Sequence, residues 1–266
     1  MSVQVVLRGR EGTLKGDHLV SNAATILYLA HSKPGSYIFQ ETERYLKAFV
    51  DVEIRGISDD GLPFPTCVEE LTFMWLLKAM DHGLEKDFFE AIERAERDGY
   101  GATACASAGD FALAEARAKL SIPYLGLGWA SYWKATQIAE KFSHLHTHMA
   151  ELIAPVSVQQ IRAYGFLDRL VSVEYVDVDI YKCMAKHEEP DYDELMGIFL
   201  PKLEKCAAKG ARAITIGCGS PDLSRLARML NHIALDKYGV RVLPPIDTVV
   251  EVAREFMKKR AGSGHE

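Results

Sequence analysis

Several kinds of feature are missing from this sequence, and each absence argues against a class of protein. No apolar run approaches the roughly 18 residues that a membrane-spanning helix needs. The first residues contain no cationic segment followed by an apolar core, which is the pattern of a secretion signal. The net charge is −6, and there is no basic cluster with interleaved aromatic residues of the kind that binds nucleic acid. We therefore expect a soluble cytoplasmic protein that binds neither membrane nor nucleic acid.

Cysteine is scarce and unpaired. The five cysteines are scattered along the chain, their number is odd, and no two form a Cys-x-x-Cys motif. A disulfide framework, a structural zinc site and a thioredoxin-like redox motif are therefore not expected. The sequence also lacks the Gly-x-Ser-x-Gly motif of serine hydrolases. The chain has 266 residues, of which 48% are hydrophobic and 26% charged, an ordinary balance for a globular protein. Reduced thiols are therefore the simplest expectation.

Two similar segments contain one cysteine each. Residues 99–117 are expected to form an apolar strand ending at Cys105, a turn of small residues and a helix opened by Asp110. Residues 210–228 repeat this order around Cys218. A short apolar strand with a proline follows each copy, at residues 122–126 and 240–244. The repetition predicts two similar halves, each with one thiol at the carboxyl end of a strand.

Hydrophobic periodicity predicts alternating strands and helices along the rest of the chain. Further strands are expected at residues 3–7, 48–54, 142–148 and 170–178. Helices are expected at residues 18–31 (capped by Asp17), 66–80, 85–97, 130–141, 157–164, 191–209 and 248–260, with a loop at 57–65. This alternation favours α/β layers with mainly parallel sheets, whose ligands bind at the carboxyl ends of strands.

Two opposed thiols suit a reaction that inverts a carbon centre. A thiolate removes a proton from one face and a thiol delivers one to the other, without a cofactor. A helix N-terminus favours the thiolate and lowers the pKa of cysteine from about 8.5. Cys105 and Cys218 are therefore the predicted catalytic residues. The backbone N–H groups from Ala106 through Ser107 to Gly109, and those of Gly219 and Ser220, are predicted to bind a substrate carboxylate or enolate-like oxygen.

Other chemically suggestive residues have simpler interpretations. His144, His146 and His148 lie on one predicted strand face, but the sequence places no carboxylate or fourth ligand beside them, so no metal site is predicted. Asp110 and Asp222 are interpreted as helix caps. The remaining cysteines, Cys67, Cys183 and Cys206, are interpreted as packing or surface thiols.

At this point the sequence resembles a known family. The two cysteine turns, the Ile122-Pro and Leu243-Pro strands and residues 163–173 resemble the aspartate/glutamate/hydantoin racemase superfamily, and within it the hydantoin racemase branch. Residues 105–110 are similar to the Cys-Phe-Gly-Asp-Pro-Gly turn of that branch, and residues 142–147 to its middle strand, which ends at a substrate-side threonine. The resemblance covers roughly residues 45–258.

The resemblance implies two pseudo-symmetric flavodoxin-like lobes of mainly parallel sheet with a cleft between them. The first lobe would span residues 1–126, the second 127–244, with a helix at 245–260 returning to the first lobe and a disordered tail at 261–266. It also implies a cofactor-independent racemase or epimerase acting on a hydantoin or amino-acid-type small molecule. Cys105 and Cys218 would be its two bases and Thr147 a substrate contact. Relatives often assemble into oligomers, so a homo-oligomer stays open.

The chain departs from this branch at positions that bear on the substrate. Residues 7–10 stand where an Asn-Pro-Asn-Thr loop is usual, and Arg8 there is predicted to bind a substrate carboxylate. Residues 128–130 replace a common Gly-Glu-Ala, and Gly219 stands where amino-acid racemases tend to have threonine.

Three alternatives stay open. Arylmalonate-type decarboxylation needs only one protonating thiol, typically the second, so the presence of Cys105 counts against it. Maleate-type cis–trans isomerisation uses two cysteines, so the thiol count does not separate it from racemisation. A small-anion-binding protein without catalysis is disfavoured by the duplicated thiols.

Overall fold

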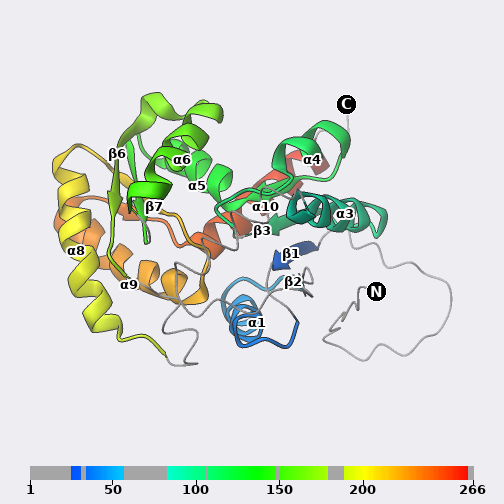
Figure 1. Ribbon diagram of the computed structural model, residues 1–266, viewed down its shortest axis with the longest axis horizontal. Coiled ribbons are helices and arrows are strands. Elements are labelled where there is room, and N and C mark those ends of the chain that lie inside the picture. The colour runs from blue at the N-terminus through cyan, green and yellow to red at the C-terminus, as the bar shows by residue number, and fades with distance from the viewer. Residues whose placement is uncertain are drawn as a thin grey trace.

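Two parallel four-stranded sheets form the framework of the molecule (Figure 1). The computed structural model describes residues 25–30, 34–56, 83–105, 107–147, 150–178 and 189–262. The first sheet has the order β2-β1-β3-β4, with strands β1 (Ile26–Ala30), β2 (Glu53–Gly56), β3 (Ala102–Cys105) and β4 (Tyr124–Gly126). The second has the order β6-β5-β7-β8, with strands β5 (Phe142–His146), β6 (Leu170–Tyr175), β7 (Ala213–Ile216) and β8 (Arg241–Val242). The two orders match strand for strand, which confirms the predicted α/β fold of two similar parallel halves.

Helices pack on both sheets. In chain order they are α1 (Tyr37–Phe49), α3 (Gly83–Arg97), α4 (Leu113–Lys119), α5 (Leu127–Ile138), α6 (Ala150–Ala163), α8 (Tyr192–Ala208), α9 (Pro221–Tyr238) and α10 (Pro245–Gly262), with a short 3-10 helix at Leu167–Arg169. Because parallel strands joined by helices are covered on both faces, every residue of β1, β3, β4, β5 and β7 is buried.

Alternate residues of the first sheet pack into two separate cores. Ile26 and Tyr28 of β1 belong to a cluster with residues of α1 and α10. Leu27 and Leu29 point to the other face and pack with α3 and α4. Cys105 belongs to this second cluster, so its side chain lies on the face covered by α3 and α4.

The second sheet is built in the same way. Leu145 of β5 and Ile216 of β7 pack in a core with residues of α8 and α9, and Cys218 belongs to this core. Phe142 and Ala213 pack on the other face with residues of α5 and α6. Each cysteine is therefore buried between its own sheet and a pair of helices.

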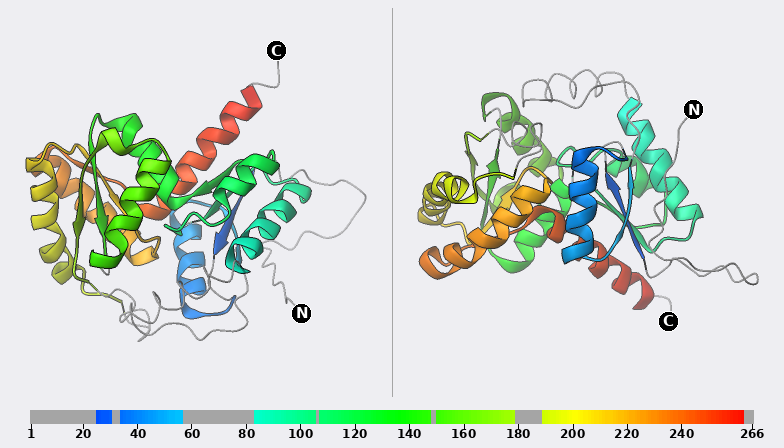
Figure 2. Two further views of the ribbon diagram at one scale, coloured as in Figure 1. Left: turned by 45° about the horizontal axis from the view of Figure 1, so that its top comes forward. Right: turned by 90° about the horizontal axis from the view of Figure 1, so that it is seen from below.

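Two helices join the halves. α10 follows the last strand of the second sheet but packs on the first, because Ile246 and Val249 share a core with Ile26 (Figure 2). α5 contacts both sheets and α10. On one side its Trp133 meets Phe256 of α10 edge to face, with ring centroids 5.6 Å apart. On its other side Tyr132 stacks on Phe142 of the second sheet at 5.9 Å.

The region before β3 differs from the sequence prediction. A helix was expected at residues 18–31, but residues 26–30 form the central strand β1, and residues 1–24 lie outside the described ranges. Residues 26–30 are buried on both faces, and an unbroken apolar run of this kind has no periodicity that separates strand from helix. α1 was not predicted; Ser36 caps it by accepting a hydrogen bond from the Phe39 N–H, at 3.3 Å. The strand expected at 48–54 begins only at Glu53, because Ala48 and Phe49 complete α1.

The other helix and strand expectations have mixed outcomes. Those at 85–97, 130–141, 142–148, 170–178, 191–209 and 248–260, and the strands of both cysteine motifs, are confirmed with boundary shifts. The helix expected at 157–164 begins earlier, since α6 starts at Ala150. α10 extends to Gly262, into the tail expected at 261–266, and residues 263–266 lie outside the described ranges. So do the predicted strand at 3–7, loop at 57–65 and helix at 66–80.

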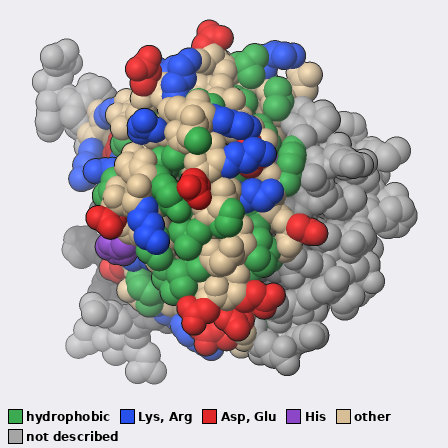
Figure 3. All heavy atoms as spheres, turned by 90° about the vertical axis from the view of Figure 1, so that its left-hand side faces the viewer, with side chains coloured by type: hydrophobic (Ala, Val, Ile, Leu, Met, Phe, Trp, Pro, Cys, Tyr) green, Lys and Arg blue, Asp and Glu red, His purple; other side chains and the backbone are tan. Residues whose placement is uncertain are grey.

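The surface over α8 shows no single sign of charge. Basic and acidic side chains are interspersed with hydrophobic ones on this face, and acidic side chains gather at its lower edge (Figure 3). None of the helices in the described ranges combines the length and hydrophobicity that a membrane span requires.

Candidate active site

The first predicted catalytic residue, Cys105, ends β3 at the carboxyl edge of the first sheet. Only 2% of its surface is exposed. Burial raises the pKa of the Cys105 thiol to about 12, although the Ser107 N–H and a hydrogen bond from Tyr124 act in the opposite direction. The negative charge of Asp110 raises this pKa further. Cys105 is therefore a protonated thiol at neutral pH, in contrast to the lowered pKa expected from a helix N-terminus.

The turn after Cys105 uses its own backbone N–H groups. The Ser107 N–H donates to the Cys105 sulfur at 3.4 Å, and the Gly109 N–H donates to Ser107 Oγ at 3.4 Å. The Asp110 N–H donates to the Ser107 carbonyl at 3.2 Å. α4 begins only at Leu113, after Ala112, which adopts a left-handed φ of 57° and makes no side-chain cap. The thiol is thus separated from the helix that follows it.

The second predicted catalytic residue, Cys218, lies just beyond β7 and immediately before α9. Its exposed fraction is 6%. Ser220 caps the helix by accepting a hydrogen bond from the Leu223 N–H at 3.0 Å, and Pro221 occupies the first helical turn. Because α9 is 18 residues long and begins here, its N-terminal dipole favours negative charge beside Cys218. Gly219 and Ser220 therefore lie where the sequence placed them, between a thiol and a helix N-terminus.

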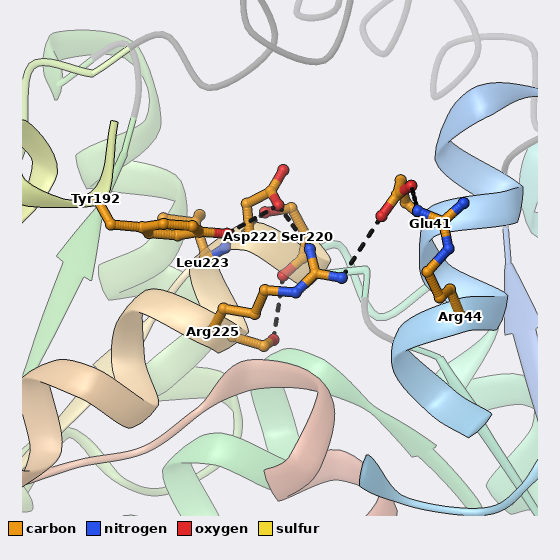
Figure 4. Close-up of polar contacts among 8 residues, drawn as sticks. Glu41, Arg44, Tyr192, Ser220, Asp222, Leu223 and Arg225 are labelled. Carbon is orange, nitrogen blue, oxygen red and sulfur yellow. Dashed lines mark hydrogen bonds and ion pairs between the residues drawn. The ribbon is translucent and has the colours of Figure 1, made fainter. Parts of the chain in front are cut away.

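A polar cluster connects the start of α9 with α1 (Figure 4). Arg225 Nη1 donates to Asp222 Oδ1 at 2.9 Å, and its Nη2 lies 3.5 Å from Glu41 Oε2 of α1. The Tyr192 hydroxyl donates to the same Asp222 oxygen at 3.2 Å. Asp222 was expected to cap α9, but Ser220 does so, and the aspartate pairs with Arg225 inside the first turn. Burial raises the pKa of Asp222, while Arg225 and Tyr192 lower it.

Thr147, predicted to contact substrate, lies directly after β5 and is fully buried. β5 and β7 are neighbours, with Leu145 paired to Ile216. Carrying this register two residues further sets Thr147 level with Cys218 at the carboxyl edge of the sheet. The structure therefore places a predicted substrate residue and a predicted catalytic residue just beyond the carboxyl ends of adjacent strands.

Two buried histidines lie beneath the Cys218 turn. His144 Nδ1 is 2.7 Å from Thr215 Oγ1, and its Nε2 is 3.2 Å from His146 Nε2. Burial lowers the pKa of His144 well below its usual value, and His146 adds to this effect, so His144 is neutral. A Cβ atom added at Gly217 would come within 2.9 Å of both rings. Of the three histidines that suggested a metal site, His148 lies outside the described ranges. Among the described residues, no three or more His, Cys, Asp or Glu side chains form a group that could hold a metal ion.

Asp110 caps a different helix from the one expected. Its Oδ1 accepts the Gly128 N–H at 2.8 Å and its Oδ2 the Trp129 N–H at 2.7 Å, both at the start of α5. α5 lacks a side-chain cap from its own N-cap residue, Gly126. The local spacing Asp110 to Leu113 suggested α4, whereas the fold brings the carboxylate to α5, because β3 and β4 are neighbours and end side by side.

Only some of the remaining predicted residues lie in the described ranges. Ser107 is buried in the Cys105 turn, whereas Arg8 and Ala106 lie outside the described ranges, as do Cys67 and Cys183. Cys206 is fully buried in α8, as its interpretation as a packing residue requires. Sequence reasoning missed Gln160 of α6 and Tyr164, which directly follows this helix, although both contact the Cys105 turn, and it missed Glu41 of α1. The spacing of Gly126 and Gly128 was a signal for a close approach, but nothing local identified its partner.

A family model described as Asp/Glu/Hydantoin racemase matches residues 82–253, well over half of the chain. The chain therefore belongs to the Asp/Glu/hydantoin racemase family, whose members act on small molecules. A search of curated protein sequences finds no match.

Solved structures with a similar fold share little sequence with this chain. Allantoin racemase from Klebsiella pneumoniae is 17% identical with a TM-score of 0.63, over 90% of this chain and 88% of that one. Allantoin racemase from Pseudomonas fluorescens is 16% identical with a TM-score of 0.56, over 89% and 92%. A variant of arylmalonate decarboxylase is 12% identical with a TM-score of 0.54, over 88% and 93%. At these identities the similarity establishes the two-lobed, flavodoxin-like fold.

Proposed function

We propose that this protein is a racemase or epimerase that uses Cys105 and Cys218 to invert a carbon centre next to a carbonyl. One observation supports the pairing above all others. β3 and β7 occupy the same place in two sheets of identical order, Cys105 ends the first of these strands and Cys218 follows the second. Since ligands of parallel α/β sheets bind beyond the carboxyl ends of strands, the equivalent ends of β3 and β7 are suited to a shared substrate.

The surroundings of the two thiols support different resting roles. Cys218 at the start of α9 acts as thiolate and accepts the proton from one face of the substrate carbon, which leaves a carbanion stabilised by the adjacent carbonyl. Cys105, which burial keeps protonated, gives its proton to the opposite face. The product leaves with inverted configuration, the two cysteines having exchanged protonation states, and the reverse reaction restores them. No cofactor takes part in this balance.

The proposed substrate is a hydantoin or an amino-acid-type compound. The name of the matched family supports both classes, and two of the structurally similar proteins are allantoin racemases, which act on a hydantoin-type ring. In this proposal Ala106 and Ser107 line one side of the substrate and Thr147, Gly219 and Ser220 the other. Arg8 binds a carboxylate where the substrate has one.

The lobe boundaries, the cellular location, the cofactor independence and the oligomeric state are part of the same proposal. We assign residues 1–126 with the helix at 245–260 to one lobe and residues 127–244 to the other, with the substrate cleft between them. The enzyme would act in the cytoplasm without a cofactor, as a monomer or a homo-oligomer.

Proton exchange in heavy water tests this function directly. The protein is incubated with single enantiomers of 5-substituted hydantoins, amino acids and small dicarboxylates, and NMR of the α-proton is combined with optical rotation. Exchange with inversion, lost in Cys105→Ala and in Cys218→Ala, is the expected result.

Other outcomes would replace the proposal with one of its alternatives. Carbon dioxide release from arylmalonates would indicate a decarboxylase. Arylmalonate decarboxylase has a similar fold, so this reaction belongs in the test. Conversion of maleate to fumarate would indicate a cis–trans isomerase. Binding without any reaction would indicate an anion-binding protein.

A further inference from the structure

The Asp110 carboxylate occupies a site that is shaped around it. Asp110 is buried, with 5% of its surface exposed, and it adopts a left-handed φ of 49°. A Cβ atom added at Gly126 would lie 2.2 Å from Asp110 Oδ1, and one added at Gly128 would lie 2.7 Å from Oδ2. Both positions therefore require glycine for the carboxylate to reach the start of α5. A left-handed aspartate and two glycines are a costly arrangement for an ordinary helix cap.

The same carboxylate is held from the other half of the molecule. Tyr164 directly follows α6, and its hydroxyl donates a hydrogen bond to Asp110 Oδ2 at 2.8 Å. Gln160 Nε2 of α6 donates to the Ala108 carbonyl at 2.8 Å. The turn that begins at Cys105 is thus attached by two hydrogen bonds to a helix that packs on the second sheet.

The same helix also contacts the residues beneath the Cys218 turn. Ser157 Oγ of α6 hydrogen-bonds to His146 Nε2, whose ring lies against Gly217. Ser157 and Gln160 of α6 and Tyr164, whose N–H donates to the Gln160 carbonyl directly after this helix, are separated by three and four residues. They therefore lie on one side of the helix. One face of α6 therefore contacts the surroundings of both cysteine turns.

We propose that Asp110 is a positioning residue that fixes the Cys105 turn relative to α5 and α6, and through α6 relative to the Cys218 turn. The proposal rests on the proposed function only in assigning a reacting thiol to that turn. Asp110 has a second consequence for Cys105, because its negative charge disfavours the thiolate. The residue thus sets where the thiol lies and adds to the effect of burial, which keeps the thiol protonated.

Thiol alkylation tests this role without any substrate. Wild type, Asp110→Asn and Tyr164→Phe are treated with iodoacetamide at a series of pH values under native conditions, and the rate at each cysteine is followed by mass spectrometry of its peptide. Tyr100→Phe is the matched control, because the Tyr100 hydroxyl donates to a carboxylate, Glu53 Oε2, at 2.6 Å near the opposite end of β3. Cys206, fully buried in α8, reports global unfolding in the same sample.

We expect Asp110→Asn to raise the alkylation rate of Cys105 at pH 8 by about tenfold, the effect of lowering a thiol pKa by about one unit. Its rate-versus-pH curve should move to lower pH. Tyr164→Phe removes one of the two hydrogen bonds that hold the turn and leaves the carboxylate in place. It should raise the rate by about threefold at every pH, because the turn opens more often, without moving the curve along the pH axis. In both variants the Cys206 rate should stay at the wild-type value, and Tyr100→Phe should leave both rates unchanged.

Two results would overturn the proposal. Equal increases at Cys105 and Cys206 would mean that Asp110 only stabilises the fold, and an unchanged Cys105 rate in both variants would mean that it does not position the thiol. If Asp110→Asn does not fold, Tyr164→Phe decides alone. Selective alkylation in a protein that racemises none of the substrates would reject the proposed function and keep the positioning role.

Discussion

The two cysteine turns have the same place in the topology and different physical surroundings. Cys218 is followed at once by α9, a capped helix of 18 residues. Cys105 is followed by a turn whose N–H groups bond to its own residues, and then by α4, a helix of 7 residues without a side-chain cap. A cysteine in a strand-to-helix turn therefore need not have a lowered pKa, since burial raises the pKa of the Cys105 thiol.

The aspartates after the two cysteines show the same divergence. Asp222 stays within its own helix and pairs with Arg225, so that its charge is balanced by a neighbouring cation. Asp110 leaves its turn and caps α5 through two N–H donors, with a third hydrogen bond from Tyr164. One half thus uses its aspartate locally, whereas the other uses it to attach the cysteine turn to the rest of the molecule.

Serine substitutions should produce the largest effect and separate the roles of the two thiols. Cys105→Ser and Cys218→Ser should each lower the rate of racemisation by about 10³-fold, within the range typical of general acid–base residues. In single-enantiomer exchange experiments in heavy water, Cys105→Ser should still exchange the α-proton of the enantiomer that Cys218 deprotonates. Cys218→Ser should lose that exchange.

The control for loss of a buried thiol is Cys206→Ala, since Cys206 lies in α8 and belongs to neither cysteine turn, and this variant should keep the wild-type rates. Equal loss of exchange of both enantiomers in both serine variants would remove the proposed difference between the thiols.

Alanine at the glycines beside each turn should destabilise the first turn more than the second. A Cβ at Gly126 would lie 2.2 Å from Asp110 Oδ1, and one at Gly217 2.9 Å from His144 Nε2. Gly126→Ala should therefore lower the free energy of unfolding by about 3 kcal/mol and Gly217→Ala by about 1–2 kcal/mol, as overpacking does elsewhere. Urea denaturation midpoints at constant slope provide the measurement.

Gly197→Ala is the matched control for these two substitutions. Gly197 lies inside α8, with nothing within 4 Å of an added Cβ. Alanine there should raise stability by up to about 1 kcal/mol, since glycine is unfavourable in a helix interior. A loss at Gly126 no greater than that at Gly217 would contradict the closer fit of the Cys105 turn.

The sequence was sufficient for the second half of the molecule and insufficient for parts of the first. Residues 142–178 and 191–260 have strong periodicity and recognisable helix boundaries, such as Asp191 at the start of α8 and Gly239 after α9. Most of their elements were predicted, although α6 begins at Ala150 and the short 3-10 helix was not expected. Residues 26–30 were assigned to a helix because a strand buried on both faces leaves no alternation to read.

The candidate site divides in the same way. The repeated cysteine motifs located Cys105 and Cys218 because strand, thiol and turn are adjacent in the sequence. The partners of Asp110 at Gly128 and Tyr164 come from strands and helices that meet only in the folded chain, and the raised pKa of Cys105 depends on burial. Neither is encoded in a local pattern.

The stability of the first half should depend on pH through Asp110. Burial raises the pKa of this carboxyl to about 6 from an ordinary value of 3.8, against the opposing effects of Tyr164, the two N–H donors and Arg117. A raised folded-state pKa means that the native protein binds more protons than the unfolded chain between these values. Its stabilising contribution is therefore complete below about pH 4 and is lost as the pH rises through about 6, by up to about 3 kcal/mol.

The measurement is the difference in unfolding free energy between wild type and Asp110→Asn from pH 4 to pH 7. Wild type should lose stability relative to the variant across this window. A difference that does not change with pH would show that the carboxyl ionises equally in the folded and unfolded chains.

Substitutions at the N-termini of α9 and α4 should give the smallest difference in the free energy of unfolding. Ser220→Ala removes the hydroxyl that accepts the Leu223 N–H and should cost about 1 kcal/mol, the usual value of an N-cap. Ala112 has no such bond to lose, and its left-handed φ of 57° is one that glycine adopts without strain. Ala112→Gly should therefore change stability by less than about 0.5 kcal/mol, because relief of backbone strain offsets the lost methyl group and the added chain entropy. Urea denaturation at pH 7 measures both changes in the free energy of unfolding. A loss in Ala112→Gly as large as that in Ser220→Ala would mean that the N-terminus of α4 is stabilised as strongly as that of α9.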